Sequence, residues 1–154
     1  MRCVKRWLVL AAVGLSILGA PGGTALARPK VEWSRIEVPE SSARLAKVLR
    51  SALEQAARKA NFGKLKSITL SAKLVEWSAE PRGDVLRVTC TVMGRVVGGQ
   101  GARSKISFGG SLAARDELEK QVVTMVANGL VARLAQIARG HAPKTTLDGP
   151  RPLL

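Results

Sequence analysis

Residues 85–108 read VLRVTCTVMGRVVGGQGARSKISF, and their alternation of apolar and polar side chains decides the fold class. Every second residue of the first half is apolar: Leu86, Val88, Cys90 and Val92. A period of two is that of a strand with one buried face. The glycine-rich segment 98–101 follows, and residues 102–108 then alternate again. We therefore predict an antiparallel hairpin in which both strands turn the same face inward.

The register of this hairpin follows from parity. Inner side chains must face inner side chains, because a slip of one residue turns every side chain to the other face. Pairing Val92 with Ile106 and Cys90 with Phe108 meets this condition and leaves residues 98–100 as the loop. Glycines supply the positive φ that such a loop needs. On this register, Cys90 is predicted to be buried near Phe108.

Two further strands are predicted before the hairpin. The apolar residues of residues 68–75 alternate in the same way: Ile68, Leu70, Ala72 and Leu74. Residues 79–84 contain Pro, Gly and Asp, and predict the turn into the next strand. Residues 31–38 predict a short strand or extended arm that ends at Pro39.

Apolar residues at helical spacing predict a first helix that ends near residue 60. Its stripe is Leu45, Val48, Leu49, Ala52, Leu53 and Ala56. Ser41 or Ser42 is expected to cap the start of this helix. Gly63 stands where a glycine commonly follows a helix end.

A second, long helix is predicted over residues 113–139. Its apolar side is Leu118, Val122, Val126, Leu130, Leu134 and Ile137. Asn128, Arg133 and Gln136 interrupt the apolar run, so we interpret it as a core helix and not as a membrane span. Gly129 marks either a close crossing or a kink, because a mid-helix glycine costs stability.

The order of these elements is strand, helix, three strands, helix. The expected fold class is α+β: a two-layer sandwich of an antiparallel three- to four-stranded sheet with two helices packed on one face. Residues 28–139 are predicted to form this single domain, and residues 140–154 a flexible tail that contains three prolines.

The first 27 residues predict export. Arg2, Lys5 and Arg6 precede an uncharged run over residues 7–19, and Ala25-Leu26-Ala27 is a small-x-small cleavage site. This order is that of a secretory signal peptide over residues 1–27. The apolar run is short of the ~20 residues of a membrane-spanning helix. The mature protein is expected to begin at Arg28, without a transmembrane span, in the periplasm or outside the cell.

Charge predicts a polyanionic partner. The chain of 154 residues has 25 Lys and Arg against 11 Asp and Glu, and three of the cations lie in residues 1–27, which leaves a net +11 beyond them. Such a balance attracts anionic polymers of the cell envelope or acidic lipid surfaces. Nucleic acid is not expected, because the compartment is wrong and the predicted strand surface lacks aromatic side chains for base stacking.

The outward face of the strands is the candidate binding site. Its predicted cations are Lys73, Arg87, Arg95, Arg103 and Lys105, without a carboxylate among them in the strands. If both helices cover the other face, these side chains form an open platform for a polyanion. The alternative is a solvated face that only discourages aggregation between sheets.

The sequence predicts no set of residues that would form a catalytic or cofactor-binding site. His141 is the sole histidine and Cys90 the sole cysteine after residue 27, so no metal, heme or nucleophilic site is expected. Glu76 beside Trp77 would suit a sugar site, but a tryptophan that covers the edge of the core explains the pair better.

The leading hypothesis is therefore an exported, non-enzymatic, basic accessory or binding module of the cell envelope, without cofactors. The alternative is a protein-interaction adaptor of an envelope or secretion assembly, which docks through Trp33, Trp77 or its first strand. A hydrolase ranks third, because the carboxylates lie mainly at turns and helix ends.

Overall fold

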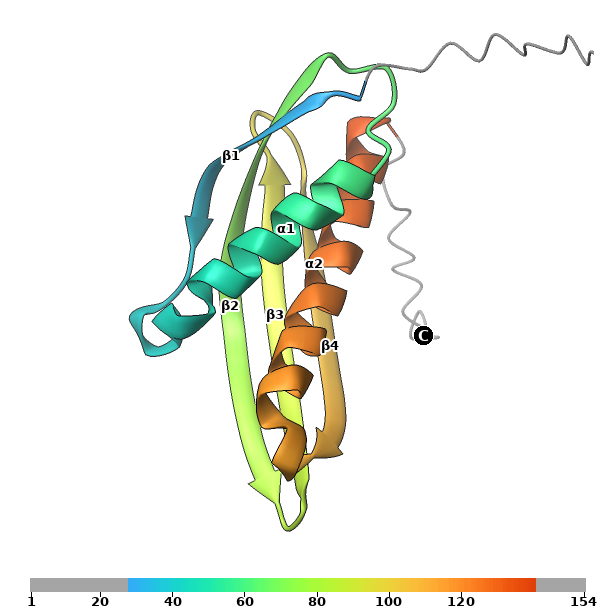
Figure 1. Cartoon of the computed structure of the whole chain (residues 1–154). Helices are drawn as coiled ribbons and strands as arrows, with labels where there is room; N and C mark the ends of the chain where they lie inside the picture. Colours follow the sequence, from blue (N-terminus) through green and yellow to red (C-terminus); the bar gives the residue numbers. More distant parts are fainter. Residues whose placement is uncertain (1–27, 141–154) are drawn as a thin grey trace, which may run out of the picture.

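The computed structural model describes residues 28–140, which form a four-stranded sheet with both α-helices on one face (Figure 1). The elements are β1 (Lys30–Glu37), the 3₁₀ helix η1 (Glu40–Leu45), α1 (Ala46–Lys59), β2 (Ser67–Arg82), β3 (Val85–Val96), β4 (Gly101–Ser111), the 3₁₀ helix η2 (Leu112–Ala114) and α2 (Arg115–Ala138). The predicted two-layer α+β class is confirmed. The predicted signal peptide, the tail beyond Gly140 and His141 lie outside the described residues.

The sheet has the order β1-β2-β3-β4 and is not wholly antiparallel, which corrects the prediction. β1 and β2 run parallel, with Trp33 opposite Leu70, while β2, β3 and β4 pair antiparallel. The physical reason is the connection. Because α1 carries the chain back along the sheet, β2 begins at the same end as β1 and runs in the same direction.

The second strand is longer than its sequence predicts. β2 continues through residues 79–82, so the predicted turn over 79–84 is wrong, and Gly83 and Asp84 alone connect β2 to β3. Gly83 has φ +61° at this turn. The cause of the error is a β-bulge at Val75, which interrupts the period of two and so hides the continuing strand.

The β3–β4 hairpin has the predicted parity but a register shifted by two residues. Cys90 pairs with Ile106 and Val88 with Phe108, and the turn centres on Gly98, whose φ is +76°. Cys90 is buried, as predicted. Phe108 pairs with Val88 on the edge strand and keeps 43% of its surface exposed, so its predicted pairing with Cys90 and its predicted inward burial are wrong.

The start and the end of α1 also differ from expectation. The chain enters α1 through η1, and neither Ser41 nor Ser42 makes a side-chain cap; Ser42 is instead buried within η1. The helix ends because Ala60 is extended, and Gly63 takes its positive φ in the turn that follows. The predicted apolar stripe is correct, since all its members except the partly buried Val48 lie in the core.

Small residues let α2 lie close to the sheet. A Cβ atom on Gly94 of β3 would lie 3.0 Å from side-chain carbons of both Leu130 and Leu134. A Cβ on Gly129 of α2 would lie 2.9 Å from Ser104 Oγ, so Gly129 marks a close crossing. By length and composition the segment 112–138 would be able to cross a membrane, but its apolar side here packs against β3, β4 and α1.

A buried carboxylate with two half-exposed arginine partners joins the end of η1 to the start of α2. Glu119 of α2 is 3% exposed and accepts hydrogen bonds from Arg44 Nη1 at 2.6 Å, Arg44 Nη2 at 3.0 Å and Arg115 Nε at 3.0 Å. Burial pushes the pKa of Glu119 upward, but the two guanidinium groups outweigh it, and the pKa lies below its ordinary value. This pair fastens η1 to α2.

We expect Gly94→Ala to lower the free energy of unfolding by about 1–3 kcal/mol, because the added methyl meets two leucines that are themselves buried. Gly109→Ala on β4 is the matched control, since its Cβ would find its first neighbour only at 3.8 Å. Urea unfolding measures both. Equal stability of the two variants would show that close packing under α2 is not needed.

We expect Glu119→Gln to lower the free energy of unfolding by about 1–2 kcal/mol at pH 7. The expected loss is small because both arginines are about half exposed to water. A carboxyl with a lowered folded pKa stabilises the fold fully above its unfolded pKa of about 4.3, and loses this contribution as the pH falls through the lower, folded value. The difference in unfolding free energy between wild type and variant should therefore shrink in acid. A pH-independent difference would contradict the assignment.

Candidate functional site

The face of the sheet opposite the helices, here called the outer face, carries all five predicted cations. Each is exposed, and they come from three strands: Lys73 from β2, Arg87 and Arg95 from β3, and Arg103 and Lys105 from β4. Lys73 and Arg103 both pair with Met93, and Arg95 is two residues further along β3. Lys73, Arg95 and Arg103 thus lie together toward the β3–β4 turn, whereas Arg87 lies apart.

The outer face also carries carboxylates, which corrects the prediction that it has none. Glu76 Oε2 accepts hydrogen bonds from Lys105 Nζ at 3.1 Å and from Thr91 Oγ1 at 2.9 Å. Lys73 Nζ lies 3.4 Å from Glu37 Oε2. The bulge at Val75 is the cause for Glu76, because it shifts the parity of β2 and turns this side chain outward.

The ion pair with Lys105 changes the electrostatics of Glu76. The hydrogen bond from Lys105, followed by that from Thr91, lowers the pKa of Glu76 below its ordinary value. The carboxylate is therefore charged near neutral pH and neutralises Lys105. Trp77, the next residue, packs against the core on the inner side, so Glu76 and Trp77 do not line one sugar site.

Three guanidinium groups of the outer face have no carboxylate within ion-pair distance among residues 28–140: those of Arg87, Arg95 and Arg103. Arg87 Nε donates to Ser107 Oγ at 3.1 Å, but this neutral partner leaves the charge of the guanidinium in place. Arg95 and Arg103 lie on adjacent strands near the β3–β4 turn, whereas Arg87 lies alone toward the other end of β3. We therefore take Arg95 and Arg103 as the candidate anion-binding pair.

A shallow depression of about 480 Å³ adjoins Arg95 on the outer face. Arg35 of β1, Lys73 of β2 and Arg95 of β3 border it, together with Glu37 and Met93. Sequence reasoning missed Arg35, because a register irregularity at Ser34 sets the parity of β1. We call the surface formed by Arg35, Lys73, Arg95 and Arg103 the cationic strip.

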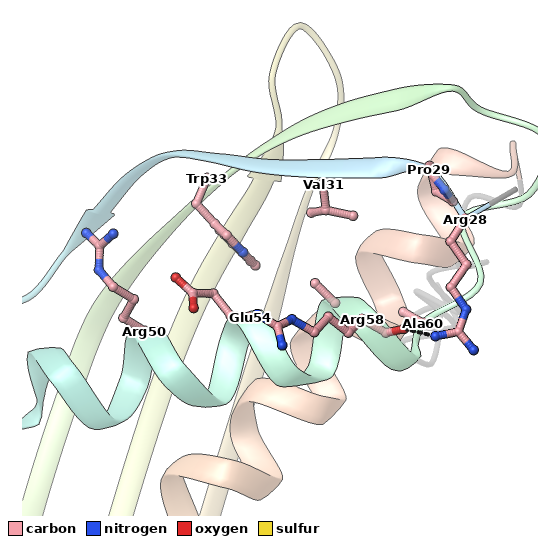
Figure 2. Close-up of a pocket in the computed structure, with 9 residues that line it drawn as sticks. Arg28, Pro29, Val31, Trp33, Arg50, Glu54, Arg58 and Ala60 are labelled. Atoms are coloured by element: carbon pink, nitrogen blue, oxygen red, sulfur yellow. Dashed lines mark hydrogen bonds between the residues drawn. The ribbon is translucent and has the colours of Figure 1, made fainter.

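A second hollow of about 450 Å³ separates β1 from α1 (Figure 2). Trp33 reaches from β1 toward α1, and Arg50, Glu54 and Arg58 line the helix side. Arg28 Nη1 donates to the Arg58 carbonyl at 3.3 Å at one end. This β1–α1 groove combines an aromatic wall with three guanidinium groups. The sequence did not indicate it, because helical spacing places these charged residues on a solvent-facing side and says nothing about a strand beside them.

Catalytic side chains do not gather among the described residues. Within residues 28–140, no three His, Cys, Asp or Glu side chains are placed to hold a metal ion. Burial, and then the charge of Glu76, raise the pKa of Cys90 to about 12. Its thiol is therefore protonated at neutral pH and is a poor nucleophile.

Comparison with known proteins shows a shared fold. No protein-family model matches the sequence, and no curated protein matches it. A crystal structure described as a "putative lipoprotein" from Caulobacter crescentus superimposes with a TM-score of 0.50 at 15% sequence identity, over 70% of this chain and 91% of the other. The similarity at this identity extends to the architecture of the sheet and helices.

Proposed function

We propose that this chain is an exported, non-enzymatic binding module of the cell envelope, and that its cationic strip binds an anionic envelope polymer. The excess of cations over acids after residue 27 supports a polyanionic partner. The leader-like residues 1–27 support export. A protein of the same fold is described as a putative lipoprotein, which agrees with an envelope location.

The observation that carries this proposal is the position of two guanidinium groups, Arg95 and Arg103, on adjacent strands of an open sheet, without a carboxylate within ion-pair distance in residues 28–140. A guanidinium binds a carboxylate or phosphate through two parallel hydrogen bonds. Neighbouring strands hold these two groups at a fixed spacing, because β3 and β4 are paired in register. A broad, shallow surface of this kind suits a polymer with repeated anionic groups, which binds through several weak contacts at once.

The double variant Arg95→Glu/Arg103→Glu should elute from immobilised polygalacturonate at much lower salt than wild type. Exposed charges are screened beyond about 8 Å at physiological ionic strength, so wild-type retention should itself fall as salt rises. The melting temperature should stay nearly constant, because within residues 28–140 neither guanidinium has a partner to lose.

The matched control is Lys47→Glu/Lys120→Glu, which changes the net charge equally at two exposed positions on the helices. Arg44 is unsuitable as a control because it pairs with Glu119. Equal loss in both double variants would mean that only the total charge matters. Retention of both at wild-type strength would reject the polymer proposal.

A protein-interaction adaptor remains the second candidate, and the edge position of β1 favours it. β1 pairs only with β2, so the backbone groups on its other side are free of the sheet. An extended segment of a partner is able to add to such an edge. Trp33 in the adjacent β1–α1 groove offers an aromatic contact for a side chain of that segment.

Export predicts cleavage after Ala27. Intact-mass analysis of the protein recovered from the envelope or the medium should give a chain that begins at Arg28, because Ala25-Leu26-Ala27 follows the uncharged run. A recovered mass that includes Trp7 would contradict the signal-peptide assignment.

A further inference from the structure

The C-terminal ends of α1 and α2 lie near the β3–β4 turn at one end of the molecule, which is at the top of Figure 1. We call this end of the molecule the basic end. Three segments form this basic end: residues 59–67, 96–101 and 138–140. They border a common depression of about 600 Å³, and Arg139 Nη1 donates to the Asn61 carbonyl at 2.6 Å across two of them. The basic end is thus one continuous surface, although its parts lie far apart in the sequence.

The charge of these three segments has a single sign, and the start of β1 beside them adds Lys30 and Glu32, which form an ion pair at 2.7 Å. The three segments contain four cations and no carboxylate: Lys59, Lys64, Lys66 and Arg139. All four are exposed. The opposite end carries charges of both signs. Its cations include Arg82 and Arg115, and exposed acids lie next to them along the chain: Asp84, Asp116 and Glu117. The molecule is therefore electrically polarised along its strands.

Apolar side chains project from the same basic end. Leu65 is 38% exposed between Lys64 and Lys66, and Val97 is 55% exposed in the β3–β4 turn. Both border the common depression. The turn is also open at the next residue, since a Cβ on Gly98 would meet nothing within 4 Å. Exposed apolar side chains among basic residues are unfavourable in water and suit the boundary between headgroups and acyl chains.

We propose that the basic end docks on an anionic lipid surface, with Leu65 and Val97 entering the headgroup layer and the lysines contacting lipid phosphates. Charge complementarity selects this occupant, because anionic leaflets attract clustered Lys and Arg. Lysine stems lie along apolar surface while the ammonium groups reach the phosphates. This docking site is distinct from the cationic strip of the proposed function and stands without it.

The docked orientation leaves the rest of the molecule accessible. β3 runs from Val85 at the far end to Val96 at the basic end, so the strands lead away from the lipid. Much of the outer face then remains open to a polymer above the membrane. A lipid surface would hold the module, and the part of the outer face that leads away from Arg95 toward Val85 would stay free for a second partner.

The test is co-sedimentation with vesicles of phosphatidylcholine, with and without phosphatidylglycerol. Wild type should bind the anionic vesicles at low salt and the neutral vesicles far more weakly. Lys64→Gln/Lys66→Gln should weaken anionic binding roughly 25-fold, since each basic residue contributes about fivefold. Leu65→Ser/Val97→Ser should weaken it roughly tenfold through loss of apolar insertion.

Two controls separate this site from total charge and from the cationic strip. Val85→Ser removes a valine that is nearly as exposed as Val97, 52% against 55%, at the far end of β3, the strand that leads into the turn of Val97, and should leave vesicle binding unchanged. Arg95→Gln/Arg103→Gln should lose polymer retention and should weaken vesicle binding much less than Lys64→Gln/Lys66→Gln does, because Arg95 adjoins the basic end without lying in it. Every variant shares the same residues outside 28–140, so their contribution cancels in the comparison.

Three results would overturn the docking proposal. They are absence of wild-type binding to anionic vesicles, an equal loss in the Val85→Ser and Leu65→Ser/Val97→Ser variants, and an equal loss in the two double Gln variants. Polymer retention in the same proteins decides the proposed function separately, because Lys64→Gln/Lys66→Gln leaves the cationic strip intact. Unchanged melting temperatures show that each exposed substitution preserves the fold.

Discussion

The close contact of α2 with β3 and β4 is the interaction on which the other features of this protein depend. Gly94 and Gly129 allow it, because a Cβ at either position would meet the opposing element at 3.0 Å or less. Leu130 and Leu134 then fill the space over the sheet and are fully buried. Both helices occupy this one face, so the charged side chains of the strands are left together on the other.

Two irregularities in the strands decide which charges oppose one another on that outer face. The shift at Ser34 brings Arg35 and Glu37 opposite β2, and the bulge at Val75 turns Glu76 outward beside Lys105. Carboxylates therefore neutralise the outer face mainly along β1 and β2. Among residues 28–140, the guanidinium groups without a carboxylate at ion-pair distance lie on β3 and β4. Arg95 and Arg103 lie together nearer to the basic end, and Arg87 lies at the other end of β3.

The described titratable groups lie apart, and the exposed cations lie on open surface. Cys90 is buried as a thiol with a pKa of about 12, and Glu76 and Glu119 are held as carboxylates by basic partners. The exposed cations spread over the open sheet and over one end of the molecule, and the two binding proposals rest on this distribution.

The sequence by itself determined the fold class, the parity of the β3–β4 hairpin, the burial of Cys90 and the outward position of all five predicted cations, because side-chain period is a local property of the backbone. It did not determine the bulge at Val75, the two-residue shift in register or the parallel pairing of β1. These depend on packing between elements, which a period of two or 3.6 does not encode. The pairing of Lys105 with Glu76 and the meeting of Leu65, Val97 and Ala138 at one depression were decided only by the tertiary structure, which brings together residues that are far apart along the chain.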